Sequence, residues 1–140
     1  MINLLNELTT YLGEKLNLIP GTNIFYNSIP DNPDKCVVLT TPKHSVAVPP
    51  QIDASTHYLR VDVRAKTSDE AYQLAALCNR WLASDVTDYS EDTDTNGFIT
   101  ITNDLSVYVH LHGTPLWDKT DQQGRRYYYF TAMLITKKIV

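Results

Sequence analysis

The sequence predicts a single α+β domain over residues 1–140, with two helices packed on one face of a mixed or antiparallel sheet. Two segments carry apolar residues at helical spacing, whereas several others alternate apolar and polar residues as strands do. A length of 140 residues is usual for one domain, and a hydrophobic content of 43% is enough to form one core. These observations place the chain among ordinary globular proteins.

The first helix is predicted over residues 3–17. Its leucines recur at every fourth position and form one apolar row: Leu4, Leu8, Leu12 and Leu16. Asn3 has the side chain of an N-cap residue, and Pro20-Gly21 prevents continuation of the helix. Gly13 is expected to weaken the helix by about 1 kcal/mol relative to alanine, so tertiary packing must support it.

Two short strands are predicted next, over residues 23–29 and 35–41. The residues between them, 30–34, are prolines, aspartates and an asparagine, which favour a turn. Residues 42–55 contain three prolines and no periodic pattern, so they are expected to form a loop.

A strand followed by a capped helix is the clearest pattern in the chain. Apolar and polar residues alternate over 58–65, which is typical of a half-buried strand. Thr67 and Glu70 have the spacing of a capping box, in which the Thr67 hydroxyl accepts a bond at the helix start and Glu70 reaches back toward the backbone. The helix that follows, to residue 84, has an apolar stripe formed by Ala71, Leu74, Ala75, Cys78 and Leu82.

An acidic segment ends this helix and leads into a hairpin. Residues 85–96 hold five acids and no base, and they are expected to form a loop. Residues 98–102 and 106–112 alternate as two strands with a turn at Asn103-Asp104. The polar residues 113–124 that come next predict a second loop.

The last strand, predicted over residues 126–137, is apolar or aromatic on both faces. One face carries Tyr127, Tyr129, Thr131, Met133 and Ile135, and the other carries Tyr128, Phe130, Ala132 and Leu134. Such a strand is expected to be covered on both sides, and the two helices of a small domain cover only one. Neighbouring copies of the chain are therefore expected to cover the second face.

Composition argues against several classes of function. The net charge of −4 is concentrated in the acidic segment, because removing its five acids from 16 leaves 11 acids against 12 bases. No basic field is present for nucleic acid, no apolar run is long enough to span a membrane, and the N-terminal residues lack the basic start of a signal peptide. Cys36 and Cys78 are therefore expected to be reduced core residues in the cytosol.

Two patterns suggest a metal-binding module, which stays an alternative. The acidic loop 92–97 matches the start of a calcium-binding loop, but Asn103 stands where a carboxylate is needed, and the residues after Gly97 alternate as a strand. His110 and His112 share a strand face at a spacing that suits two metal ligands, but no third ligand is identifiable. The expectation is no bound metal and no cofactor.

Catalytic motifs are absent from the sequence. It has no nucleophile elbow, no cysteine with a local activating pattern and no phosphate-binding loop, since its five glycines are scattered. No enzyme activity is therefore predicted. An enzyme of unrecognised type would require a buried pocket with a perturbed carboxylate.

Arginines on the strands are candidates for binding. Arg60 and Arg64 flank Asp62 on one strand face, a pattern that suits either nucleic acid or ion pairs between strands or subunits. Arg125 and Arg126 precede three tyrosines, and these two residue types anchor protein interfaces. The alternative for the second pair is a core strand with a basic start.

The order of the elements resembles that of the tail terminator (tail completion, or minor capsid) proteins of long-tailed bacteriophages. The resemblance is carried by residues 58–71 with the helix that follows, and by residues 113–125 with the aromatic strand. It implies a structural protein that forms a ring, typically a hexamer, on the end of the tail tube. Such a ring ends elongation and joins the tail to the head connector, with no enzyme activity, cofactor or metal.

The same resemblance implies the partners and the location. The partners are other copies of the chain, the tail tube protein and the head connector protein, with no membrane and no sequence-specific nucleic acid. The location is the tail or neck of the virion, after assembly in the host cytoplasm, and another head-tail connector role is the alternative. The residues assigned to the interface between copies are Arg60, Arg64, Trp117, Arg125, Arg126, Tyr127 and Tyr129.

Overall fold

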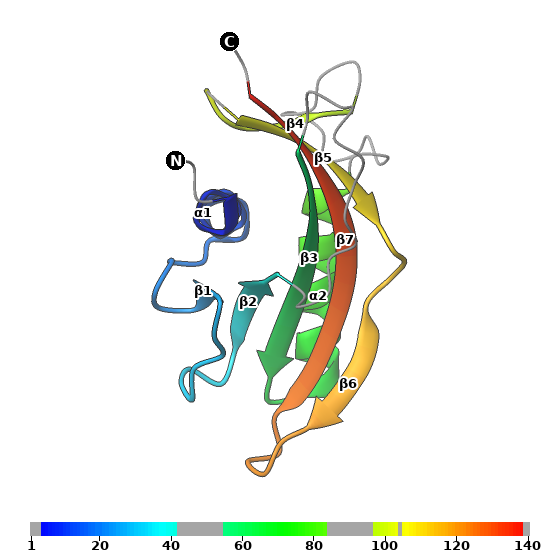
Figure 1. Ribbon diagram of the computed structural model, residues 1–140. Helices are drawn as coiled ribbons and strands as arrows, with labels where there is room; N and C mark the ends of the chain where they lie inside the picture. The colour runs from blue at the N-terminus through cyan, green and yellow to red at the C-terminus, as the bar shows by residue number, and fades with distance from the viewer. Residues whose placement is uncertain (1–3, 42–54, 84–96, 104, 139–140) are drawn as a thin grey trace.

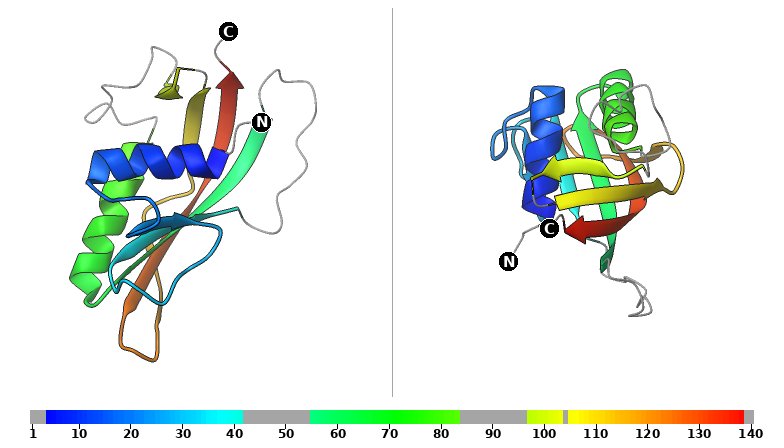
Figure 2. Two further views of the ribbon diagram at one scale, coloured as in Figure 1. Left: turned by 90° about the vertical axis from the view of Figure 1, so that its left-hand side faces the viewer. Right: turned by 90° about the horizontal axis from the view of Figure 1, so that it is seen from above.

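Two helices and seven strands are present among the residues that the computed structural model describes, which are 4–41, 55–83, 97–103 and 105–138. In chain order they are α1 (Leu4–Leu16), β1 (Ile24–Tyr26), β2 (Cys36–Thr40), β3 (Ser55–Ala65), α2 (Ser68–Leu82), β4 (Ile99–Thr102), β5 (Leu105–Leu111), β6 (Leu116–Thr120) and β7 (Arg126–Lys138). The strands form one curled sheet with both helices packed on the same face (Figure 1). Figure 2 shows α1 lying across the strands and α2 running more nearly along them. The predicted α+β class is confirmed.

The sheet is mixed, because β1 runs parallel to β2 while the other described pairs are antiparallel. The strand order is β1-β2-β3-β7-β5-β4, and β6 also pairs with β7. β3 lies along one edge of β7, and β5 and β6 share the other edge. On that shared edge, β5 pairs with residues 132–138 and β6 with residues 126–129.

α1 forms where the leucine row predicts it. The helix ends because Asn17 adopts a φ of 57°, a conformation that does not continue a right-handed helix. Gly13 is buried, and its carbonyl oxygen accepts the N–H of Leu18 at 2.8 Å. A Cβ at Gly13 would lie 2.8 Å from the Leu18 carbonyl oxygen, so the glycine permits the close return of the chain after the helix.

The start of α2 confirms the predicted cap in part. The Thr67 hydroxyl accepts the N–H of Glu70 at 3.2 Å, as predicted. The expected bond from the Thr67 backbone to Glu70 is replaced by one from the Thr67 hydroxyl, which donates to the Glu70 carboxylate at 3.3 Å. All five residues of the predicted apolar stripe of this helix are buried.

One hydrophobic core lies between the helices and the sheet. α1 contributes Leu8 and Leu12 to it, and the predicted inner face of β3 is fully buried against it. On β7 the inner residues are Phe130, Ala132 and Leu134, each with 2% exposure or less. The core therefore joins segments from both ends of the chain.

β6 was not predicted, because it lies inside the segment 113–124 that the sequence assigns to a loop. Four of its five residues are exposed, and a bulge between Trp117 and Lys119 interrupts its register with β7. A strand that is held by its neighbour on an exposed edge needs no apolar alternation of its own. The sequence therefore contains no periodic signal for it.

Other boundaries differ less. β1 is shorter than the predicted strand over residues 23–29, and the hairpin formed by β4 and β5 lies where it was predicted. The predicted loops at 42–55 and 85–96 lie almost wholly outside the described residues, as do Asn3 and Asp104. Among the helices described, neither is both long enough and apolar enough to cross a membrane.

Candidate functional site

The side chains that the sequence assigns to an interface separate into a buried group and an accessible group. Arg64, Arg125 and Tyr127 are buried within one copy, with exposed fractions of 2%, 5% and 5%. The accessible group consists of Arg60, Trp117, Arg126 and Tyr129. The two groups require separate explanations.

Arg64, on β3, is held by the loop 30–34 that joins β1 to β2. Its guanidinium donates to the carbonyl oxygens of Pro30 at 2.7 Å, of Pro33, and of Asp34 at 3.3 Å. It also lies 3.4 Å from the hydroxyl of Tyr127. A buried cation is costly unless its donors are satisfied, and here backbone dipoles of the loop satisfy them.

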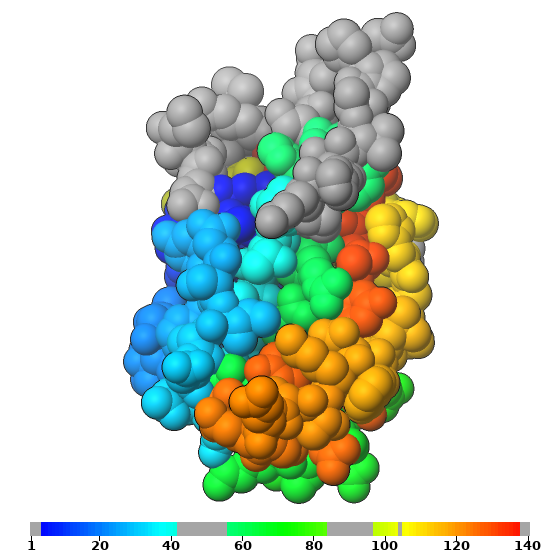
Figure 3. Space-filling model, turned by 60° about the horizontal axis from the view of Figure 1, so that its bottom comes forward, coloured from blue at the N-terminus to red at the C-terminus, as the bar shows by residue number. Residues whose placement is uncertain are grey.

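Arg125 contacts the same loop from the turn between β6 and β7. Its Nε donates to the Asp121 carboxylate at 2.8 Å, and an Nη donates to the carbonyl oxygen of Asp31. Figure 3 shows the loop and the turn side by side on the surface. The loop and the turn therefore form one packed end of the molecule. We name the side chains that join them the arginine cluster: Arg64, Asp121, Arg125 and Tyr127.

Asp121 is the central acceptor of this cluster, a role that was not predicted from the sequence. Its carboxylate also accepts the N–H groups of Gln123 at 2.9 Å and Arg125 at 3.0 Å, and the Tyr127 hydroxyl at 3.0 Å. Desolvation acts to raise the pKa of Asp121, but these bonds favour the ionised form and lower its pKa to about 2. The turn could have been predicted from the spacing of Asp121 and Gly124, because aspartate and glycine three residues apart favour a turn; the φ of Gly124 is 80°.

The cover for this end of β7 comes from the chain itself. The expectation that neighbouring copies cover Tyr127 is wrong, because Tyr127 is 5% exposed within one copy, where its hydroxyl contacts Arg64 and Asp121. The expectation that β3 is half-buried also fails here, since Asp62 on its polar face is 6% exposed. Tyr129 and Met133 are partly exposed, and their cover by another copy stays a prediction.

Arg60 forms a second charged site on the face of the sheet opposite the helices. Its guanidinium carbon lies 4.1 Å from the centre of the Tyr129 ring, and its Nε lies 3.0 Å from the Asp62 carboxylate. The carboxylate of Asp118, on β6, lies 3.5 Å from an Nη of Arg60. The hydrogen bond to Asp62 raises the pKa of Arg60. Two carboxylates therefore compete with any phosphate for this arginine, which argues against nucleic acid.

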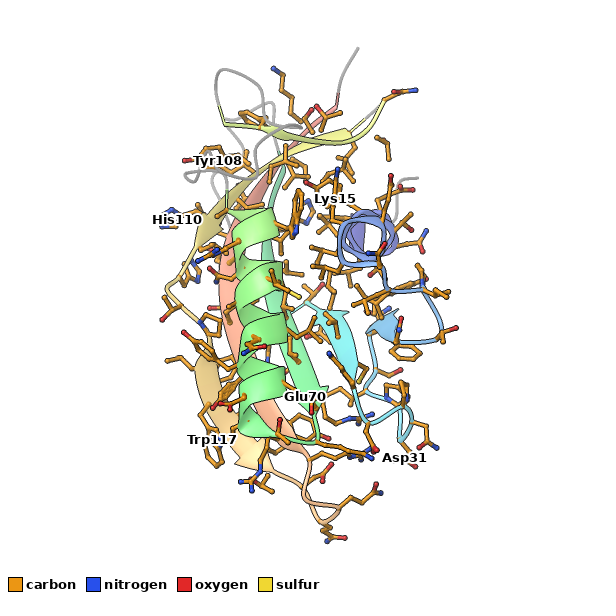
Figure 4. The ribbon with its side chains drawn as sticks, turned by 180° about the vertical axis from the view of Figure 1, so that it is seen from behind. Lys15, Asp31, Glu70, Tyr108, His110 and Trp117 are labelled. Atoms are coloured by element: carbon orange, nitrogen blue, oxygen red, sulfur yellow. The ribbon has the colours of Figure 1, made fainter. Side chains whose placement is uncertain are left out.

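Trp117 lies on β6 at the edge of the sheet and points away from it beside α2 (Figure 4). Its partner on β7 is Tyr128, whose ring centre lies 5.5 Å from that of Tyr72 on α2. Tyr72 and Leu77 line a hollow of about 290 Å³ on α2. Neither residue was predicted from the sequence as part of a surface, although both are apolar or aromatic and lie off the buried stripe of the helix.

The predicted histidine pair lies at the end of β5. The ring centroids of His110 and His112 are 5.8 Å apart, and His112 Nδ1 lies 3.2 Å from the Thr131 hydroxyl. Within the described part of the chain, no group of three or more His, Cys, Asp or Glu side chains is placed to hold a metal ion. Nearly all of the acidic loop 92–97 lies outside that part.

The two cysteines are free and buried, as predicted for core residues. Burial raises the pKa of both thiols, and that of Cys78 rises to about 12. Neither thiol is therefore activated as a nucleophile. In the described residues every buried side-chain nitrogen and oxygen has a hydrogen-bond partner. These buried groups therefore contribute to the stability of the fold.

Comparison with known proteins adds one finding. A family model described as bacteriophage tail terminator protein matches residues 11–137. The matched range begins inside α1 and ends near the end of β7, so it includes almost every described element. No curated protein matches the chain significantly.

Proposed function

Because this chain belongs to the bacteriophage tail terminator family, and is therefore a structural component of the phage tail, we propose that it forms a ring that closes the end of the tail tube. The ring ends tube elongation and presents a surface to the head connector. The observation that carries the proposal is the family match over residues 11–137.

The distribution of polar groups supports a structural role. The arginine cluster joins loop 30–34 to the turn between β6 and β7, so its charges hold the fold together. The buried thiols are held in the protonated form. Large apolar side chains remain exposed on β6, on α2 and in the segments flanking β1, where they are available for contacts with other chains.

The proposed mechanism is geometric. A head-to-tail interface between identical copies closes into a ring that presents equivalent contacts around its axis, and six copies suit a tube of sixfold symmetry. The ring occupies the surface on which the next layer of tube protein would add, so elongation ends. The proposed partners are other copies of the chain, the tube protein and the connector protein, and assembly takes place in the host cytoplasm.

Tube polymerisation in the presence of the chain tests this proposal. Purified tube protein from the same phage is polymerised with and without the chain, and the products are compared by electron microscopy. With the chain, tubes should stop growing and carry a ring at one end, whereas tubes without it should continue to lengthen. Equal growth and bare ends in both samples would contradict the proposal.

A phage in which the gene is interrupted supplies the matched test in infected cells. Its tails should exceed the normal length and should not join to heads, and the intact gene supplied separately should restore both properties. Tails of normal length attached to heads in the interrupted phage would show that the chain has another role.

A further inference from the structure

The exposed large apolar side chains of the described residues lie at the two opposite ends of the sheet. Ile19 and Ile29 flank β1, and the others lie on β6 and on α2 beside it. β1 is one end of the strand order, β6 pairs with the edge of β7 that faces away from β3, and Figure 1 shows β1 and β6 on opposite sides of the molecule. We name Ile19 and Ile29, with β1, the β1 patch. The β6 patch consists of Tyr72, Leu77, Leu116 and Trp117.

The β6 patch combines an open strand edge with exposed apolar side chains. Leu116 and Trp117 are 55% and 56% exposed, and their partners on β7 are Tyr129 and Tyr128, on opposite faces of the sheet. Within the described residues β6 pairs with β7 alone, so its outer edge keeps unpaired backbone groups. Asp118, Lys119 and the bulge protect the second half of this edge, as is usual for edge strands, whereas Leu116 and Trp117 leave its first half apolar. An exposed tryptophan in such a place marks a contact surface.

The β1 patch has a different shape. Ile19 and Ile29 are 62% and 43% exposed, and β1 pairs with β2 on one side and forms an isolated bridge between Ile24 and Pro20. Beside β1 lies a hollow of about 150 Å³, with Pro20, Ile24 and Phe25 in its lining. The patch therefore offers a concave apolar surface to a projecting apolar side chain.

We propose that the β6 patch of one copy packs against the β1 patch of the next copy in the ring. A closed ring requires two different surfaces on opposite sides of each copy, whereas a twofold dimer would bury one surface against itself. The inference rests on the ring proposed above, and it assigns the two surfaces that form the repeated contact.

Charge at the two patches agrees with this pairing. Lys119 and Arg126 are exposed beside the β6 patch, where the Asp118 carboxylate already lies 3.5 Å from the Arg60 guanidinium. Asp31 is exposed two residues after Ile29. Figure 4 shows Trp117 and Asp31 on opposite sides of the molecule. Head-to-tail packing therefore brings basic side chains of one copy toward an acidic side chain of the next, which favours this orientation over the reverse.

Two variants that each lack one patch test the pairing. Trp117→Lys removes the β6 patch, and Ile19→Lys removes the β1 patch, while both residues are too exposed to be required for the core. Each substitution should weaken self-association by roughly 30-fold, the effect of losing an interface hot spot. Sedimentation at a concentration where the unaltered chain forms rings should then show each variant as a monomer.

Mixing the two variants distinguishes this pairing from others. The intact β1 patch of Trp117→Lys can meet the intact β6 patch of Ile19→Lys, so the mixture should form one-to-one dimers but no rings. Asn103→Lys is the matched control, because it adds the same charge at an exposed position in the turn between β4 and β5. This control should assemble as the unaltered chain does.

The outcomes separate this inference from the proposed function. An unaltered chain that stays monomeric even with tube protein overturns the ring and the inference together. Rings in both variants, or a mixture that stays monomeric, overturn the pairing of the patches and leave the ring standing. If circular dichroism shows that a variant is unfolded, hydrogen exchange of the unaltered chain replaces that test. The β6 amides should then exchange at least about tenfold more slowly in rings than in monomers. Equal exchange overturns the pairing.

Discussion

Arg64 and Arg125 are two buried cations near one another, and neither depends on another copy of the chain for its partners. Arg64 binds carbonyl oxygens of loop 30–34, and Arg125 binds Asp121 as well as that loop. A planar guanidinium has five donors in a fixed arrangement and therefore reaches several acceptors at once. Arginine often anchors protein interfaces, but these two arginines are buried within one copy and therefore stabilise the fold.

Replacement of Arg64 should reveal this structural role. Arg64→Met keeps much of the side-chain volume but leaves buried carbonyl oxygens without donors, so the free energy of unfolding should fall by about 3 kcal/mol. Urea unfolding followed by tryptophan fluorescence measures it. The control is Arg126→Met at an exposed position, where a change within about 0.5 kcal/mol is expected. Equal effects of the two substitutions would contradict the assignment.

Asp121 should make stability depend on pH in the acid range. Its folded pKa of about 2 lies below the usual value of an unfolded aspartate, about 3.9. The stabilisation is therefore present above about pH 4 and is lost as the pH falls toward 2. The melting temperature of Asp121→Asn should lie below that of the unaltered chain at pH 7, and the two should converge in acid. A constant difference down to pH 2 would disprove this coupling.

At the scale of elements, α1 reverses an expectation drawn from helix propensity. The sequence predicts that Gly13 weakens the helix relative to alanine. In the structure the carbonyl oxygen of Leu18 lies where a Cβ would approach to 2.8 Å, and that oxygen belongs to the backbone. The position therefore selects glycine by steric contact, and propensity is the smaller effect.

Gly13→Ala should accordingly destabilise the protein, by about 1–3 kcal/mol, because the turn after α1 must move. Thermal unfolding by circular dichroism measures the change. Thr10→Ala, at an exposed position of the same helix, is the control and should leave stability nearly unchanged. A rise in melting temperature for Gly13→Ala would show that propensity outweighs the contact.

At the scale of the whole molecule, one core and one buried cluster hold opposite faces of the same sheet. Cys78 lies in the core on α2, and Cys36 lies on β2 opposite Arg64, near the arginine cluster. The two thiols therefore report on the two faces separately. Because β3 and β7 connect both faces along their whole pairing, we expect the faces to unfold together.

Thiol labelling along a urea titration tests this cooperativity. Burial and raised pKa values should keep both cysteines unreactive toward an aromatic disulfide reagent in the native state. Both should become reactive at the midpoint seen by fluorescence, as single-cysteine variants would show. Labelling of Cys36 at a lower urea concentration than Cys78 would mean that loop 30–34 opens on its own.

Local patterns in the sequence were sufficient for both helices, the Thr67 cap and the strands that form the core. The leucine row of α1 and the apolar stripe of α2 identify the buried faces of these helices, because helix geometry brings every third or fourth residue to one side. The alternation in β3 identifies its inner face, because successive side chains of a strand point to opposite faces of the sheet. The resemblance to tail terminators drew on the order of these elements, and the family match confirms it.

Only the tertiary structure decided which residues of β7 are buried and where the exposed surfaces lie. Tyr127 is buried beside Arg64, which is distant in sequence, and β6 forms through its pairing with β7. The exposure of Trp117 and Ile19 at opposite edges likewise depends on strand order. The periodicity of a segment shows which of its side chains share a face. Whether that face is buried depends on which other segments pack against it, and the local sequence does not contain this information.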